Sequence, residues 1–276
     1  MNKTLAWDMR TLMQSTLLFP LHPILSRLEA NHFPSLQDCN ALLAEHQPGI
    51  TVQQGMQLSF VAQAFGKQGF ESQYEPRCFL KGEVQMRENN WHDLLNALVW
   101  LTFPKSKAAI NTRHYHALTD APLQITTRQR GAVRDTNTLL DESGVIVVCS
   151  DAELATLLRD FQWKELFCRR RERVIESMGF YIFGHGLYEK ALQPYIGMTG
   201  QGVVLIVEQA FFTWPLLQQL THLDSLLASR LAMPEFGCNT RELCPVPLLG
   251  VPGWAAENGS EAYYENTAYF RNGRRS

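Results

Sequence analysis

Hydrophobic and polar positions predict two consecutive helices within residues 89–117, NNWHDLLNALVWLTFPKSKAAINTRHYHA. Asn90 is a suitable N-cap for a first helix, Trp91–Thr102, which ends there because the residue before a proline avoids the helical region. Pro104 favours the first turn of a second helix that reaches about residue 117. Three of the eight histidines stand in this largely apolar segment. A segment that served only the core would not need so many polar side chains, so we expect a polar site here.

Other periodic segments predict helices in both halves of the chain. Ser35 or Asp38 is expected to cap a helix, and Asp151 to cap another that ends near Phe161. Further helices are predicted over Trp163–Ser177, Phe180–Gln193 and Pro215–Arg230. Short strands are expected within residues 50–62 and at Gly202–Val207, and the turn-rich residues 66–88 predict a surface loop or an edge hairpin.

A β-hairpin is expected between Thr138 and Cys149. The apolar run that ends at Cys149 follows the letters DESG, which are typical of a turn. Asp141 and Glu142 are therefore predicted to lie in that turn, where aspartate forms local hydrogen bonds. Their use as ligands of a hard metal ion is the other interpretation.

After Met233 the periodic pattern gives way to proline, glycine and aromatic residues. Trp254, Tyr264 and Phe270 carry apolar area that needs burial, so an ordered wrap is expected over residues 234–276. The fold class predicted for residues 1–276 is α+β: a mainly helical single domain with a small antiparallel sheet or hairpin between Ile125 and Cys149.

Composition limits the partners. The chain has 276 residues, is 45% hydrophobic and carries a formal net charge of −2, which gives no bulk attraction to nucleic acid or to an anionic membrane. No apolar run reaches the roughly 18 residues that span a bilayer, and the N-terminus lacks the pattern of a secretory signal. The six cysteines are scattered without a C-x-x-C pair. These features predict a cytoplasmic protein with reduced thiols and no membrane partner.

Basic residues gather at Lys164–Arg173, together with Arg128, Arg130 and Arg134. Such a run can bind phosphates or nucleic acid, but it is more often an exposed helix face with internal Glu–Arg pairs. Nucleic acid is therefore only a weakly supported partner.

The first predicted helix places His92, Asp93 and Asn96 along one edge. A neutral imidazole beside a carboxylate suits general base catalysis or metal binding. Asp93 also lies three residues after Asn90, where an acid in the first turn complements the helix dipole, so capping is its simpler role.

The second predicted helix places Lys107, Asn111 and His114 on one face, at spacings of four and three residues. This face suits an anionic or polar ligand, and it equally suits solvent. If the face binds a ligand, His114 is a candidate metal ligand.

Gly184-His185-Gly186 with Glu189 puts an imidazole and a carboxylate four residues apart in an apolar segment. Glu189 could simply satisfy a buried His185. The two glycines, however, leave room for a ligand or for another backbone segment beside the ring. Because His92 and His185 both belong to apolar helices that must pack, we expect them to meet in one site.

In their order along the chain, four stretches resemble a proteobacterial family known as domain of unknown function 3025: NNWHDLLNALVWLTFPKSKAAIN, RDTNTLLDESG, FGHGLYEK and PLLGVPGWAAENGSEAYYENTAYFR. The resemblance covers roughly residues 70–272. It implies no activity, fold or ligand. It does imply that the following residues belong to the recurring pattern of the family: His92, Asp93, Asn96, Lys107, Asn111, Asp135, Asp141, Glu142, His185 and Glu189.

Two functions fit these residues. The first is a hydrolase with a divalent metal as its candidate cofactor and an anionic or phosphate-containing substrate. Its catalytic residues would be His92, Asp93, His185 and Glu189, its metal ligands His114 and Asp135, and its substrate-binding residues Asn96, Lys107, Asn111, Arg130 and Arg134. The second is a non-catalytic binding or regulatory protein whose polar network is structural. Common nucleotide-binding, esterase and zinc-protease motifs are absent from the sequence, which leaves the reaction open.

Overall fold

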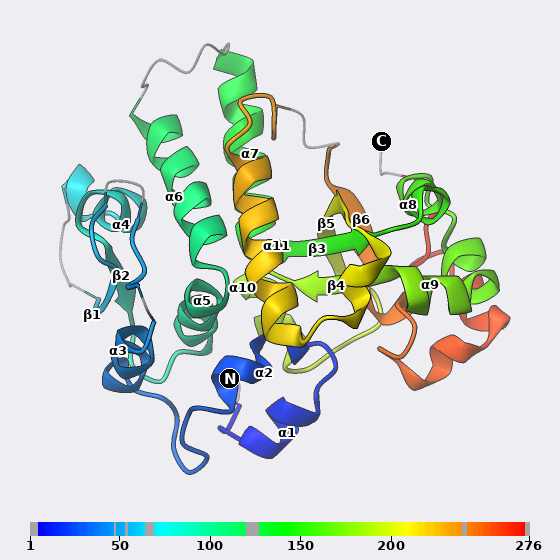
Figure 1. Ribbon diagram of the computed structural model, residues 1–276, viewed down its shortest axis with the longest axis horizontal. Coiled ribbons are helices and arrows are strands. Elements are labelled where there is room, and N and C mark those ends of the chain that lie inside the picture. The colour runs from blue at the N-terminus through cyan, green and yellow to red at the C-terminus, as the bar shows by residue number, and fades with distance from the viewer. Residues whose placement is uncertain are drawn as a thin grey trace.

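The computed structural model describes residues 5–46, 48–52, 55–63, 69–119, 127–238 and 242–273, without the side chains of residues 127–130. Helices and two small sheets make an α+β fold (Figure 1). In the described part of the chain, no helix is both long and apolar enough to cross a membrane.

The bounds of the helices and strands are given in chain order. The helices are α1 Met9–Gln14, α2 His22–Leu25, α3 Leu36–Ala44, α4 Tyr74–Lys81, α5 Trp91–Thr102, α6 Pro104–Leu118, α7 Thr127–Ser143, α8 Ala152–Arg159, α9 Arg171–Ser177, α10 His185–Ala191 and α11 Leu216–Leu231. The strands are β1 Ser59–Ala62, β2 Glu83–Met86, β3 Gly144–Cys149, β4 Met178–Ile182, β5 Thr199–Ile206 and β6 Cys244–Pro247.

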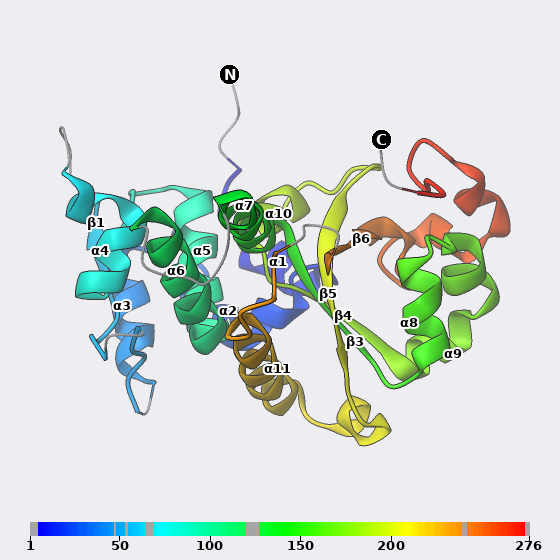
Figure 2. The ribbon, with the colours of Figure 1, turned by 90° about the horizontal axis from the view of Figure 1, so that it is seen from above.

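The larger sheet has the strand order β4-β3-β5-β6. Strand β3 is parallel to β5 and antiparallel to β4, while β6 is antiparallel to β5, so the sheet is mixed. Every residue of β3 is buried, as expected of an apolar strand that is covered on both faces. Figure 2 shows α7, α10 and α11 on one side of the sheet and α8 and α9 on the other.

The predicted helices of residues 89–117 are confirmed. The side chain of Asn90 accepts a hydrogen bond from the backbone N–H of Asp93 at 3.0 Å, which caps α5. Pro104 stands in the first turn of α6. The predicted capping of α3 by Ser35 and of α8 by Asp151 is also found.

The predicted hairpin over Thr138–Cys149 is wrong. Helix α7 continues to Ser143 and leads directly into β3, so Asp141 and Glu142 lie in the last helical turn. The inner face of α7 buries Val133, Thr136, Asn137, Leu140 and Asp141. Three of these five residues are polar, so the pattern of hydrophobic residues does not show the helical spacing.

Two other predictions are corrected. The segment Phe180–Gln193 is not one helix, because β4 ends at Ile182 and α10 begins at His185. A short apolar run suits a buried strand as well as a buried helix. Residues 66–88 are not merely a loop or edge hairpin, since they contain α4 and β2, and β2 pairs in parallel with β1.

The C-terminal segment lies against α9 and the preceding basic run. Tyr264 and Phe270 are buried, and the Tyr264 hydroxyl donates to the backbone carbonyl of Gly250. Lys164 forms ion pairs with Glu261 and with Glu265. Within the basic run, Arg169 and Arg170 also pair with Glu165. The basic residues thus face acids of the same chain.

Candidate metal centre

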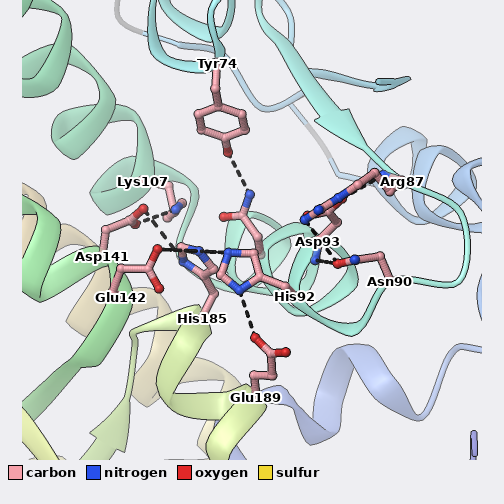
Figure 3. Close-up of polar contacts among 11 residues, drawn as sticks. Tyr74, Arg87, Asn90, His92, Asp93, Lys107, Asp141, Glu142, His185 and Glu189 are labelled. Carbon is pink, nitrogen blue, oxygen red and sulfur yellow. Dashed lines mark hydrogen bonds and ion pairs between the residues drawn. The ribbon is translucent and has the colours of Figure 1, made fainter. Parts of the chain in front are cut away.

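Three helices bring acids and imidazoles to one point beside the larger sheet. Helix α5 supplies His92 from its first turn, and α10 supplies His185 as its first residue. The last turn of α7 supplies Asp141 and Glu142. Figure 3 shows these side chains directed toward one another. The predicted meeting of His92 and His185 is therefore confirmed.

The two imidazoles approach each other through their Nε2 atoms, which are 3.1 Å apart. The Oε1 atom of Glu142 lies 3.5 Å from the Nε2 of His185 and 4.0 Å from the Nε2 of His92. One ligand atom from each of these three residues lies within 4.8 Å of the others, a spacing that one metal ion can bridge.

An acid faces the Nδ1 atom of each ring. For His92 it is Glu189, whose Oε2 lies 2.9 Å from Nδ1. For His185 it is Asp141, whose Oδ2 lies 3.7 Å from Nδ1. An ionised carboxylate only accepts hydrogen bonds, so each acid favours the tautomer with the proton on Nδ1.

In those tautomers both Nε2 atoms carry lone pairs, and the two atoms lie 3.1 Å apart. This contact is repulsive unless a cation, or a proton shared by the two nitrogens, lies between the rings. Two nitrogens bound at about 2.0–2.1 Å to one ion, with an angle of about 100° between the bonds, lie about 3.1 Å apart. The separation of the two nitrogens is therefore compatible with a shared metal ion as well as with a hydrogen bond.

Electrostatics also favour a cation. Burial opposes ionisation of Asp141, but Lys107, His185 and His114 together outweigh it and lower the pKa of Asp141 to about 2. Burial, together with the charges of Asp141 and Glu189, raises the pKa of Glu142. Burial lowers the pKa of His185 to about 4, which keeps this imidazole neutral and able to bind a metal at pH 7.

The site is buried at His185 and open toward Glu142. The side chain of His185 is 7% exposed, whereas those of His92 and Glu142 are 33% and 45% exposed. A metal held by these three groups would keep at least one coordination position on the solvent side, which is the arrangement of catalytic rather than structural zinc sites.

Glycines allow α7 and α10 to meet so closely. A Cβ atom at Gly186 would lie 2.3 Å from Oε2 of Glu142, and one at Gly184 would lie 2.5 Å from the backbone nitrogen of Ser143. The sequence predicted a ligand or another backbone segment beside these glycines. The backbone at the end of α7 lies against Gly184, and the Glu142 carboxylate lies against Gly186.

The other predicted catalytic residue, Asp93, faces away from the two imidazoles. Its carboxylate accepts two hydrogen bonds from the Arg87 guanidinium, at 2.8 Å each, and a third from the Arg87 backbone N–H (Figure 3). Burial opposes ionisation of Asp93, but these bonds outweigh it and lower its pKa. Asp93 thus ties the start of α5 to the end of β2.

The predicted substrate-binding residues have protein partners. Asn96 donates to the Tyr74 hydroxyl at 2.7 Å, and Asn111 donates to Glu75 at 2.6 Å. Lys107 is paired with Asp141. Arg134 is exposed and lies 3.9 Å from Asp135, while the side chain of Arg130 is outside the described residues.

His114 and Asp135 are the predicted metal ligands, and neither joins the group of His92, Glu142 and His185 found among the described residues. His114 is buried two turns beyond Lys107 on α6. Asp135 is exposed and, at about 1.5 Å per residue, lies roughly 10 Å along α7 from Glu142.

Sequence reasoning gave Glu142 only a minor role, although it completes the group. It also overlooked Tyr74 and Glu75, which are the partners of the two buried amides. The sequence did contain one sign of this role: the acid pair Asp141-Glu142 stands directly before an apolar strand. The pair points to a site only if the residues before the strand form a helix, as α7 does.

Residues 58–274 match the model of a family described as a protein of unknown function, DUF3025. The chain therefore belongs to this family. Neither a curated protein nor a solved structure matches the chain.

Proposed function

We propose that this protein is a metal-dependent hydrolase whose divalent ion is bound by His92, His185 and Glu142. The observation that carries the proposal is the 3.1 Å approach of two Nε2 atoms whose Nδ1 atoms each face an acid. A cation between the rings removes the repulsion of their lone pairs.

Two imidazoles and one carboxylate form a known ligand set of catalytic zinc, with water in the fourth position. Such an ion polarises a carbonyl or phosphoryl group and makes water a stronger nucleophile near pH 7. In this chain, Glu189 and Asp141 orient the rings, and the exposed side of Glu142 leaves an approach for substrate. Neither Asp93 nor Asn96 contributes to this proposal.

The anionic substrate stays a prediction, and Lys107 does not strengthen it. The positive charge of Lys107 is matched by Asp141 at 2.5 Å, and its side chain is 3% exposed. The ionised side chains of Asp141, Glu142 and Glu189 and the ammonium of Lys107 have a summed formal charge of −2. A divalent ion brings the formal charge of this group to zero. A neutral ester or amide suits that balance at least as well as a phosphate ester.

Metal content tests the proposal. The protein purified without chelator should hold about one divalent ion per chain, as a preformed site with three ligands implies. His92→Ala, His185→Ala and Glu142→Gln should each lower the affinity at least 10-fold. His116→Ala is the matched control, because His116 lies on α6 against Phe79 and outside the group.

Hydrolysis of a panel of nitrophenyl carboxylate and phosphate esters should depend on the same three residues and on the bound ion. Iron in the purified protein would favour oxidative chemistry instead, because two histidines and one carboxylate also form the ligand set of non-haem Fe(II) oxygenases. A wild-type protein that neither contains nor takes up a divalent ion would overturn the proposal. The histidines would then share a proton in a structural network, as in the non-catalytic alternative.

A further inference from the structure

Lys107 is a buried ammonium group within the fold. Its side chain is 3% exposed, and its Nζ atom lies 2.5 Å from Oδ1 of Asp141 and 5.6 Å from the centre of the Trp100 ring. Removing an ammonium from water costs several kcal/mol, and a hydrophobic residue of similar volume would often be at least as stable at such a position. The stability of the fold alone therefore does not explain this lysine.

The two oxygens of Asp141 face different groups. Oδ1 accepts from Lys107, and Oδ2 faces Nδ1 of His185 at 3.7 Å. Nδ1 of His185 is buried and has no hydrogen-bond partner within 3.5 Å. The Asp141 carboxylate is the negative group that faces this nitrogen, and its ion pair with Lys107 favours the orientation in which it does so.

We propose that Lys107 is a positioning residue of the metal centre: through Asp141 it holds His185 in the tautomer that directs the Nε2 lone pair toward Nε2 of His92. This inference rests on the proposed metal site. The corresponding acid of His92, Glu189, is 47% exposed and has no such buried cation beside it among the contacts of the described residues. The two halves of the site are thus held differently, one by a buried ion pair and the other by a surface carboxylate.

The geometry predicts an effect of Lys107→Met on metal affinity. The variant leaves Asp141 without its cation and frees the carboxylate to turn, so the affinity for Zn²⁺ should fall 10- to 100-fold, the usual effect of losing a group that orients a metal ligand. Titration against a chromophoric chelator measures this. Lys105→Met is the matched control, because Lys105 lies two residues away on α6 and its Nζ donates to the Ser225 hydroxyl, outside the site. Its affinity should stay within twofold of wild type.

The double variant Lys107→Met, Asp141→Asn separates positioning from packing. A pair that only joins α6 to α7 would tolerate replacement of both charges, and metal affinity would then stay within twofold of wild type. That outcome, or an unchanged affinity in Lys107→Met, would overturn the inference while leaving the metal site itself intact.

If the variants do not fold, the tautomer of His185 in the metal-free wild-type protein still tests the inference. Long-range ¹H–¹⁵N correlation spectra of the histidine rings should show His185 protonated on Nδ1 and unprotonated on Nε2. The opposite tautomer would show that Asp141 and Lys107 do not orient the ring. A wild-type protein that shows the expected tautomer but binds no Zn²⁺ would refute the proposed function and not the positioning by Lys107.

Discussion

Gly186 shows how one missing side chain shapes the candidate site. It is the second residue of α10, where alanine would favour the helix, yet a Cβ atom there would meet Oε2 of Glu142 at 2.3 Å and the Glu142 carbonyl oxygen at 3.0 Å. The carboxylate can turn away, but the backbone oxygen cannot do so without moving the end of α7. The glycine therefore allows Glu142 to take its position in the site and does not stabilise α10.

Gly186→Ala should consequently separate metal binding from stability. The free energy of unfolding should change by less than about 1 kcal/mol, because the gain in helix propensity offsets the crowding. Metal affinity should fall at least 10-fold, because Glu142 is displaced. Chelator competition and denaturant unfolding of the same preparation measure the two effects. Gly131→Ala on α7 is the control, since a Cβ atom there meets nothing within 4 Å; equal metal affinity in both variants would contradict this role of Gly186.

At the scale of elements, remote contacts fix the helices that carry the site. Helix α6 begins without a side-chain cap of its own, and Asp224 of α11 supplies one. The carboxylate of Asp224 accepts from the backbone nitrogens of Lys105 and Ser106, at 3.0 and 2.8 Å. Asp224 and Ser106 are buried, so the bond between them replaces water that cannot reach the backbone N–H of Ser106.

Asp224→Ala should lower the free energy of unfolding by about 1–3 kcal/mol, because it removes the cap of α6 and leaves the buried backbone N–H of Ser106 unsatisfied. Ser225→Ala, at the next position of α11, should stay within about 0.5 kcal/mol of wild type. Urea denaturation measures both. If Asp224→Ala is as stable as wild type, solvent must reach the first turn of α6 and the cap is dispensable.

At the scale of the whole molecule, the C-terminal segment completes the sheet and covers its outer helices. Strand β6 pairs with β5 along the edge of the larger sheet. The Tyr269 hydroxyl donates to the carbonyl of Met198, 71 residues earlier in the chain, and accepts from the backbone N–H of Leu249. Arg171 donates to the carbonyl of Asn258. Apolar burial and polar contacts both hold the segment in place.

A chain that ends at Met233 should therefore aggregate or lose its cooperative unfolding transition. Burying one large apolar side chain contributes about 1.5–3 kcal/mol, and the truncation removes Tyr264, Tyr269 and Phe270 together with β6. A chain that ends at Gly273 is the control and should behave as wild type. Thermal unfolding and size-exclusion chromatography measure the outcome. A soluble fragment 1–233 with a sharp transition would show that the segment is a mobile tail and not part of the core.

The sequence alone determined the elements whose signals are local. Asn90 and Pro104 set the start of α5 and of α6, because a capping side chain and a proline act within one turn of their own position. The apolar run that ends at Cys149 likewise indicated a strand, although not the hairpin that was expected around it. Sequence reasoning also selected His92 and His185, because imidazoles in apolar helices require a partner.

Only the tertiary structure decided which groups those imidazoles meet. His92 and Glu189 are 97 residues apart, so their contact depends on the packing of α5 against α10. One interpretation of the sequence had Glu189 satisfy His185 from the same helix, whereas Asp141 of α7 faces His185. Helix α7 itself escaped prediction because its buried face carries Thr136, Asn137 and Asp141. A buried polar side chain is tolerated only when a hydrogen-bond or charge partner satisfies it. Here the partners come from other parts of the chain, so the local pattern of hydrophobic residues cannot reveal them.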